Sequence, residues 1–79
     1  MRILSGTADR NIRFTEMRAL LLALDFQERI RGSHHIYTRE GVKEILNLQP
    51  RDDGLAKPYQ IRQVRDVLVK YRLADSTSE

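Results

Sequence analysis

Hydrophobic periodicity is strongest in the run TEMRALLLALDF, residues 15–26. Its apolar positions recur at i, i+3, i+4 and i+7, the spacing that places side chains on one face of an α-helix. These positions are Met17, Leu20, Leu21 and Leu24. We expect Thr15 to cap the N-terminus of this helix, and Asp25 falls where a left-handed residue commonly ends one. The pattern predicts a helix with one buried face.

A second helical pattern begins at Pro58, in PYQIRQVRDVLVKYRL. Proline suits the first position of a helix, because the N–H that it lacks would have no partner inside the helix. The apolar stripe follows at i, i+3, i+7 and i+10, and comprises Ile61, Val64, Leu68 and Tyr71. A second amphipathic helix is therefore predicted.

Three short runs separate the helices: QERIR (27–31), HHIYTR (34–39) and VKEILNLQP (42–50). They contain β-branched and aromatic residues and are divided by Gly-Ser and Arg-Glu-Gly, so we expect strands joined by short turns. Side chains alternate between the two faces of a strand. The middle run thus places His34, Ile36 and Thr38 on one face and His35, Tyr37 and Arg39 on the other. In the third run Leu46 and Leu48 share a face.

The order of these elements predicts an α+β fold, α-β-β-β-α, with a three-stranded antiparallel sheet. Each helix must bury its apolar stripe, so we expect both helices on one face of the sheet and the other face open. Residues 1–13 are interpreted as an N-terminal arm, with Ile3, Leu4, Ile12 and Phe14 as expected anchors. Residues 14–73 form the domain, and the polar residues 74–79 are expected to be a flexible tail.

Composition narrows the class of protein. A chain of 79 residues without cysteine holds one small domain that depends on a single apolar core. No apolar run approaches the roughly 20 residues that span a bilayer, and no signal-peptide pattern opens the chain. We therefore expect a cytoplasmic protein without a membrane partner.

Charge is distributed unevenly. Fourteen Lys and Arg against eleven Asp and Glu give a net charge of +3. Between residues 54 and 72 the balance is 5 − 1 = +4. The residues concerned are Lys57, Arg62, Arg65, Lys70 and Arg72 against Asp66. A polyanionic partner fits this excess, although a solvated helix face fits it as well.

The two histidines, His34 and His35, are adjacent. Strand alternation sends them to opposite faces, and the chain has no cysteine and no third histidine, so we expect no metal and no other cofactor. One histidine could instead move a proton on RNA, whose 2′-hydroxyl attacks the neighbouring phosphodiester once it is deprotonated. Nearby arginines would offset charge on the phosphate. A purely structural strand histidine remains the alternative.

Gly32-Ser33-His34 follows a helix that ends at an aromatic residue, Phe26, and precedes the aromatic Tyr37. Together with the order and length of the elements, this arrangement resembles the HicA toxin family over residues 14–73. The resemblance implies a fold similar to a double-stranded RNA-binding domain. It also implies mRNA cleavage as the activity and inhibition by a HicB antitoxin.

By position, the essential histidine of the family matches His34, in a turn formed by Gly32 and Ser33. We interpret His35 as structural. The candidates for RNA contact are Arg29, Arg31, Gly32, Ser33, Lys57, Arg62 and Arg65. The chain departs from the family pattern in three ways: Asp25 replaces a usual glycine, Pro50-Arg51 lacks a second histidine, and the arm is longer.

The sequence therefore predicts the toxin of a type II toxin–antitoxin system, a metal-independent mRNA endoribonuclease that uses His34 as its general base or acid. Its expected partners are mRNA and a HicB-like antitoxin. The alternatives are a non-catalytic RNA-binding module of the same fold and a degenerate toxin that only binds its antitoxin.

Overall fold

The computed structural model describes residues 11–73, and every structural statement below concerns that part of the chain. Residues 1–10 of the arm, with Ile3 and Leu4, and the tail 74–79 lie outside it. The elements are α2 (Phe14–Ala23), β1 (Gln27–Arg31), β2 (His34–Thr38), β3 (Leu46–Leu48) and α3 (Pro58–Lys70). The predicted α+β class and the order α-β-β-β-α are confirmed.

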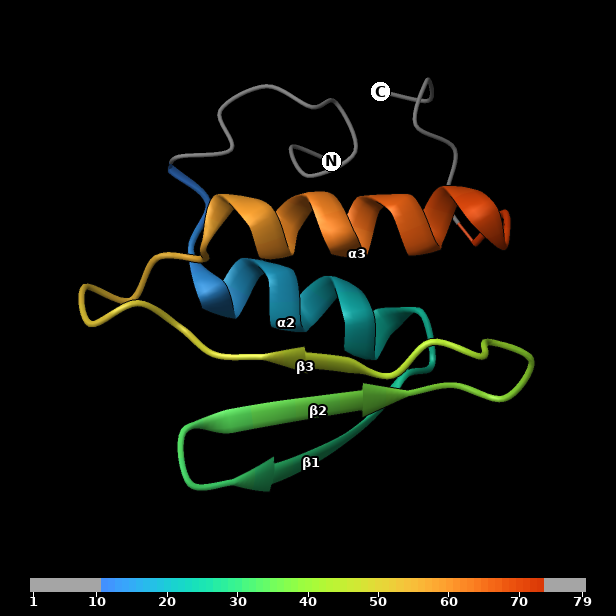
Figure 1. The fold of residues 1–79 in the computed structure, drawn as a ribbon, viewed down its shortest axis with the longest axis horizontal. Coiled ribbons are helices and arrows are strands. Elements are labelled where there is room, and N and C mark those ends of the chain that lie inside the picture. The colour runs from blue at the N-terminus through green and yellow to red at the C-terminus, as the bar shows by residue number, and fades with distance from the viewer. Residues whose placement is uncertain (1–10, 74–79) are drawn as a thin grey trace.

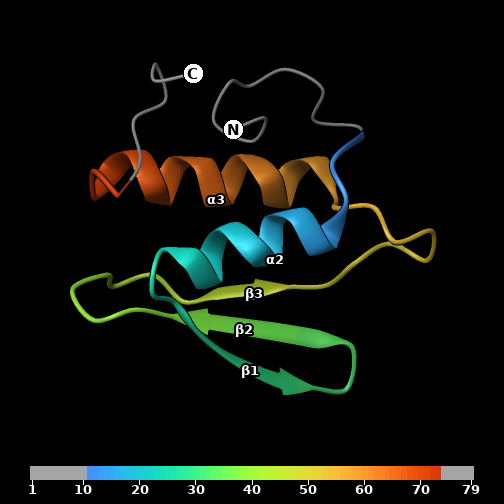
Figure 2. The same ribbon diagram turned by 180° about the vertical axis from the view of Figure 1, so that it is seen from behind.

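The three strands form one antiparallel sheet in the order β1-β2-β3. Both helices lie on the same side of this sheet, and the other side is open (Figures 1 and 2). The turn between β1 and β2, the chain that leaves β3 and the start of α3 all lie at the same end of the molecule (Figure 1).

A single apolar core fills the space between the helices and the sheet. Its fully buried side chains come from every layer and include Met17, Leu21, Tyr37, Leu46, Leu48, Ile61, Val64 and Leu68. Ile12, an expected anchor of the arm, is also fully buried. Its backbone carbonyl accepts a hydrogen bond from the N–H of Ala56 over 2.8 Å, so the chain just before α2 is tied to the segment that precedes α3.

The expected cap of the first helix is wrong. Helix α2 begins at Phe14, and its N-cap residue is Arg13, whose side chain makes no capping hydrogen bond. The N–H of Phe14 instead donates to the carbonyl of Gly54 over 3.0 Å, and Arg13 forms an isolated antiparallel bridge with Leu55. A contact distant in sequence thus satisfies the helix end that a local side chain was expected to cap.

Asp25 adopts the left-handed conformation expected after the first helix, with φ of 71°. Beside it, the guanidinium of Arg39 donates to the carbonyl of Leu24 over 2.9 Å. This bond satisfies one of the carbonyl groups left unpaired at the end of α2, and it fixes the end of the helix to the chain that follows β2.

The third strand is shorter than predicted. Only Leu46–Leu48 pairs with β2, whereas a strand was expected over 42–50. The chain turns after Arg39, whose carbonyl accepts from the N–H of Val42 over 3.0 Å. The N–H of Lys43 then donates to the hydroxyl of Tyr71 over 3.2 Å, so it faces α3 and not β2. At the other end, Pro50 has no N–H to donate to a ladder.

Helix α3 starts with Pro58 at its first turn, as predicted. Ile61, Val64 and Leu68 of its predicted stripe are fully buried, and Tyr71 packs against the core from just beyond the helix. Within residues 11–73, neither helix is both long and apolar enough to cross a membrane.

Candidate active site

The strand register assigns each side chain to a face, because residues directly opposed in an antiparallel pair point the same way. His34 lies opposite Arg31, and His35 lies opposite Ile30 and Leu48. Leu48 is fully buried beneath the helices, so His35 faces them and His34 faces the open side. The predicted separation of the two histidines is confirmed.

His34 is exposed and opens β2, directly after the turn at Gly32 and Ser33. Gly32 has φ of 60°, which suits the first position of a two-residue hairpin turn with a positive φ. Apart from Gly32 and its two chain neighbours, no described residue has an atom within 4 Å of where a Cβ on Gly32 would stand. The backbone conformation, and not lack of space, therefore favours glycine here.

Two amide side chains from β3 and the residue just after it contact this turn region. The Nδ1 atom of His34 lies 3.0 Å from Oδ1 of Asn47, and Nε2 of Gln49 donates to Oγ of Ser33 over 3.0 Å. Asn47 lies in β3 and Gln49 just beyond it. The end of β3 therefore contacts both Ser33 in the turn and His34 directly after it. The result is a histidine on a braced hairpin and not on a loose loop.

The open face is basic near His34. Arg29 and Arg31 share this face, because they lie opposite Ile36 and His34 respectively. Both arginines are exposed. Along the described strands, no Asp or Glu falls on this face, since Glu28 lies opposite the buried Tyr37. A negatively charged ligand would therefore meet no carboxylate beside His34 on the sheet surface.

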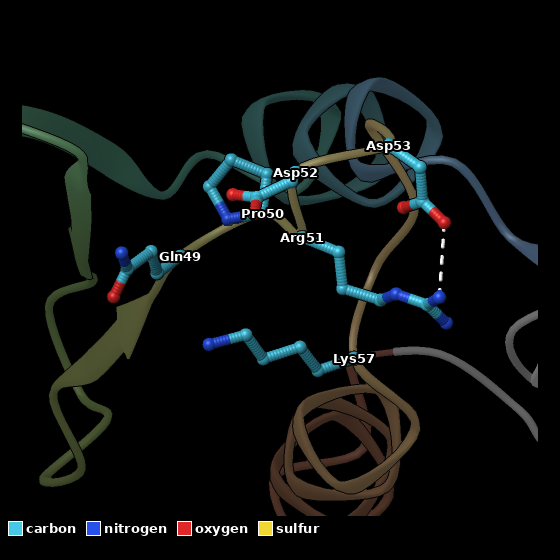
Figure 3. A pocket seen from close by; sticks show the side chains of 6 residues that line it. All are labelled: Gln49, Pro50, Arg51, Asp52, Asp53 and Lys57. Atoms are coloured by element: carbon cyan, nitrogen blue, oxygen red, sulfur yellow. Dashed lines mark ion pairs between the residues drawn. The ribbon is translucent and has the colours of Figure 1, made fainter.

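Lys57 comes to the same end of the molecule. It lines an open pocket of about 460 Å³ together with Gln49, Pro50, Arg51, Asp52 and Asp53. Figure 3 shows the ammonium of Lys57 extending across the pocket toward Gln49, while Arg51 turns away to pair with Asp53. That ion pair spans 2.9 Å. Gln49 lines this pocket and also bonds Ser33, so it connects the wall of the pocket to the His34 turn.

The other predicted contacts are not brought to His34. Arg62 and Arg65 lie on α3, which covers the opposite side of the sheet from the open face (Figures 1 and 2). Arg62 is exposed and Arg65 is half-buried. The structure thus joins Arg29, Arg31 and Lys57 to the turn and leaves the two α3 arginines on a separate surface.

On the helix side, His35 belongs to a polar network centred on Glu28. The Glu28 carboxylate accepts two hydrogen bonds from Arg18, over 2.7 and 2.9 Å, and a third from the hydroxyl of Tyr37. Nδ1 of His35 lies 3.2 Å from the same carboxylate. The hydrogen bond from Arg18 is the largest cause that lowers the pKa of Glu28 to about 2. Burial, together with the bond to Glu28, raises the pKa of Tyr37.

His35 is packed as a core residue would be. Its side chain is 19% exposed, and its ring meets the ring of Phe14 edge-on at a centroid distance of 4.8 Å. These contacts fit the structural interpretation of His35, because they fix the imidazole between α2 and the sheet.

Sequence reasoning missed Asn47, Gln49 and Glu28. Asn47 alternates with the buried Leu46 and Leu48, so its exposure on the open face follows from the strand pattern. Its contact with His34 depends on how β2 and β3 align, which a single strand pattern does not specify. The sequence around Glu28 did not indicate its role, because the side chains that bind it come from α2 and β2.

Within residues 11–73, no three His, Asp or Glu side chains gather closely enough to hold a metal ion. Comparison of the chain with family models, curated proteins and solved structures found no match. The functional interpretation therefore rests on the residues and the geometry described above.

Proposed function

We propose that this protein is a HicA-like toxin, an endoribonuclease that cleaves mRNA with His34 as its proton-transfer group. The observation that carries this proposal is the placement of an exposed histidine, on a braced hairpin, beside Arg31 and Arg29 and away from carboxylates. The α-β-β-β-α order with both helices on one side of the sheet supports the proposed likeness to a double-stranded RNA-binding domain.

The chemistry suits a single histidine. His34 takes the proton of the RNA 2′-hydroxyl, and the 2′-oxygen attacks the adjacent phosphorus. The bond from phosphorus to the 5′-oxygen breaks, and that oxygen leaves with a proton from solvent. The products are a 2′,3′-cyclic phosphate and a 5′-hydroxyl. Arg31 and Arg29 stabilise the negative charge on the phosphate oxygens.

The basic residues suggest a path for RNA. The phosphate nearest the cleaved bond lies over Arg31 and Arg29, and the strand then passes Gly32 and Ser33 to reach Lys57 in its pocket. Arg62 and Arg65 contact only an RNA long enough to continue around this end of the molecule to α3. We therefore assign Arg31, Arg29 and Lys57 to short RNAs and the α3 arginines to longer ones.

Inhibition by a HicB-like antitoxin follows from the same surface. A protein that covers His34 and both strand arginines needs a face with carboxylates, because complementary charge steers and orients such complexes. We propose direct occlusion of the open sheet face in the cytoplasm. A HicB-like reading frame beside this one would support the assignment as one half of a toxin–antitoxin pair.

The test is cleavage of an RNA oligonucleotide by the purified protein in the presence of EDTA. We expect fragments with 2′,3′-cyclic phosphate and 5′-hydroxyl ends, and no cleavage of the DNA oligonucleotide of the same sequence. Loss of cleavage on adding EDTA would contradict the metal-independent mechanism.

A non-catalytic RNA-binding module is the second candidate, because Arg29 and Arg31 are exposed on the open face and can contact phosphates whether or not His34 moves a proton. The same fold can bind RNA through shape and 2′-hydroxyl contacts alone. RNA binding without any cleavage, in the same assay, would favour this module over the toxin.

A further inference from the structure

We propose that Asn47 is a positioning residue for His34: its side-chain oxygen accepts a hydrogen bond from Nδ1–H and leaves Nε2 as the basic nitrogen. The inference rests on the proposed function for its catalytic meaning. The hydrogen bond and the tautomer that it selects are properties of the folded protein, and they can be measured without RNA.

The register explains how this contact arises. Asn47 lies directly opposite Ile36. His34 is two residues before Ile36 and therefore points to the same, open face, where it is the diagonal neighbour of Asn47. Diagonal pairs on one sheet face lie within reach of long side chains. The 3.0 Å separation of His34 Nδ1 and Asn47 Oδ1 is that of a hydrogen bond.

The atoms in contact select the tautomer. A neutral imidazole carries one N–H, and an amide oxygen can only accept a hydrogen bond. With Oδ1 of Asn47 facing Nδ1 of His34, the proton must lie on Nδ1. The second nitrogen, Nε2, is then the one that takes a proton from a substrate. The opposite orientation of the amide would place an N–H against Nδ1 and reverse this assignment.

An amide suits this face better than a carboxylate would. The neighbouring charges are Arg31, directly across from His34, and Arg29, across from Ile36, while Lys57 extends toward Gln49 at the same end (Figure 3). The carboxylate of Glu28 lies on the helix side, bound to His35. Asn47 therefore holds the ring without adding negative charge where a phosphate must bind. Gln49 braces Ser33 in the same way.

The first experiment measures the tautomer of His34 in the free protein, by ¹H–¹⁵N correlation spectra of its imidazole at a pH where the ring is neutral. We expect the Nδ1–H form in the wild type and a shift toward the Nε2–H form in Asn47→Ala. A wild-type ring in the Nε2–H form, or a tautomer ratio unchanged in Asn47→Ala, would overturn the proposal.

The second experiment compares RNA cleavage by the same proteins. Asn47→Ala should lower kcat by about 10-fold, by analogy with the lower end of the effect of partners that orient a metal-bound histidine, and leave KM unchanged. Asn47→Asp should restore kcat but raise KM, because its carboxylate repels the phosphate of the substrate. It should also move the acid limb of the pH–rate profile upward, because a carboxylate favours the imidazolium. If Asn47 had a purely structural role, Asn47→Ala would unfold more readily, but the folded variant would cleave with the wild-type kcat.

Thr38→Ala is the matched control, since Thr38 lies on the open face at the far end of β2 and should change neither tautomer nor kcat. An unchanged kcat in Asn47→Ala with active wild type would refute the positioning role. If the wild type binds RNA but does not cleave it, the proposed function fails. In that case the spectra still test whether Asn47 accepts a hydrogen bond from His34. Failure of the positioning role and failure of the proposed function are therefore distinguishable.

Discussion

At the scale of single residues, Glu28 shows how one carboxylate holds two layers together. It lies in β1 and binds Arg18 of α2, the hydroxyl of Tyr37 and the ring of His35. Its side chain is only 11% exposed, so most of its former contacts with water have been replaced by these partners. Loss of the charge would leave several donors unsatisfied in a partly buried site.

We predict that Glu28→Gln lowers the free energy of unfolding by about 2 kcal/mol near neutral pH, the value of hydrogen bonds to a charged group. The pKa of Glu28 is lowered from 4.5 to about 2 in the folded protein. The charge therefore stabilises the fold above pH 4.5, and this contribution is lost as the pH falls toward 2.

Thermal melts between pH 7 and 2 measure this effect. The difference in Tm between wild type and Glu28→Gln should shrink as the pH falls below 4.5, because the wild type loses the same charge. Glu40→Gln, at an exposed position, is the control and should follow the wild type. A difference that stays constant down to pH 2 would contradict the role of the Glu28 charge.

At the scale of elements, both helices were predictable and the third strand was only partly so. The apolar spacing at i, i+3, i+4 and i+7 and the proline at position 58 indicate helices from local sequence alone, without knowledge of tertiary contacts. The length of β3 depends on Tyr71 and Lys70, which bind Lys43 and Glu44 from the end of α3. No pattern within 42–50 reports a partner so distant in the sequence.

Tyr71 is the residue whose removal tests that explanation. Its hydroxyl donates to Glu44 over 2.6 Å and accepts from the N–H of Lys43 over 3.2 Å. In Tyr71→Phe, we expect the amide of Lys43 to exchange with solvent roughly 5-fold faster, as the loss of one net hydrogen bond implies. Tyr59→Phe, an exposed aromatic on α3, is the control and should leave this amide unchanged.

Hydrogen-exchange rates measured by NMR decide the matter. The hydrogen-bonded amides of β2 should keep their protection in Tyr71→Phe, since the β1–β2 pairing does not involve Tyr71. Unchanged exchange at Lys43 would show that the hydroxyl does not hold the segment between β2 and β3 against α3.

At the scale of the whole molecule, the fold sorts the basic residues into two surfaces. Alternation along the strand HHIYT predicted that His34 and His35 lie on opposite faces of the sheet, whereas the pairing of His35 with the buried Leu48 was needed to place His34 on the open face. The positive run between residues 54 and 72 did not predict a shared surface. Lys70 pairs with Glu44 over 2.8 Å, Arg62 lies on α3, and Lys57 alone of these three lines the pocket beside Gln49. Chain proximity and spatial proximity differ here because α3 lies across the sheet from the open face.

This sorting predicts the salt dependence of RNA binding. Each phosphate neutralised on single-stranded RNA contributes about 0.7 to the slope of log affinity against log salt. Arg31→Gln and Lys57→Gln should each reduce the slope by about 0.7 for a short RNA. Lys70→Gln, whose charge is held by Glu44 at the far end of α3, should leave it unchanged. An equal reduction in the Lys70 variant would contradict the proposed RNA path.

The central claim is that His34 carries out the proton transfer in RNA cleavage, and the rate of a single turnover tests it most directly. With excess enzyme and EDTA present, His34→Ala should cleave RNA about 10²–10⁴-fold more slowly than the wild type. The exposure of His34 makes normal folding of this variant the expectation, and a thermal melt checks it. Cleavage at the wild-type rate by a correctly folded His34→Ala protein would contradict the claim.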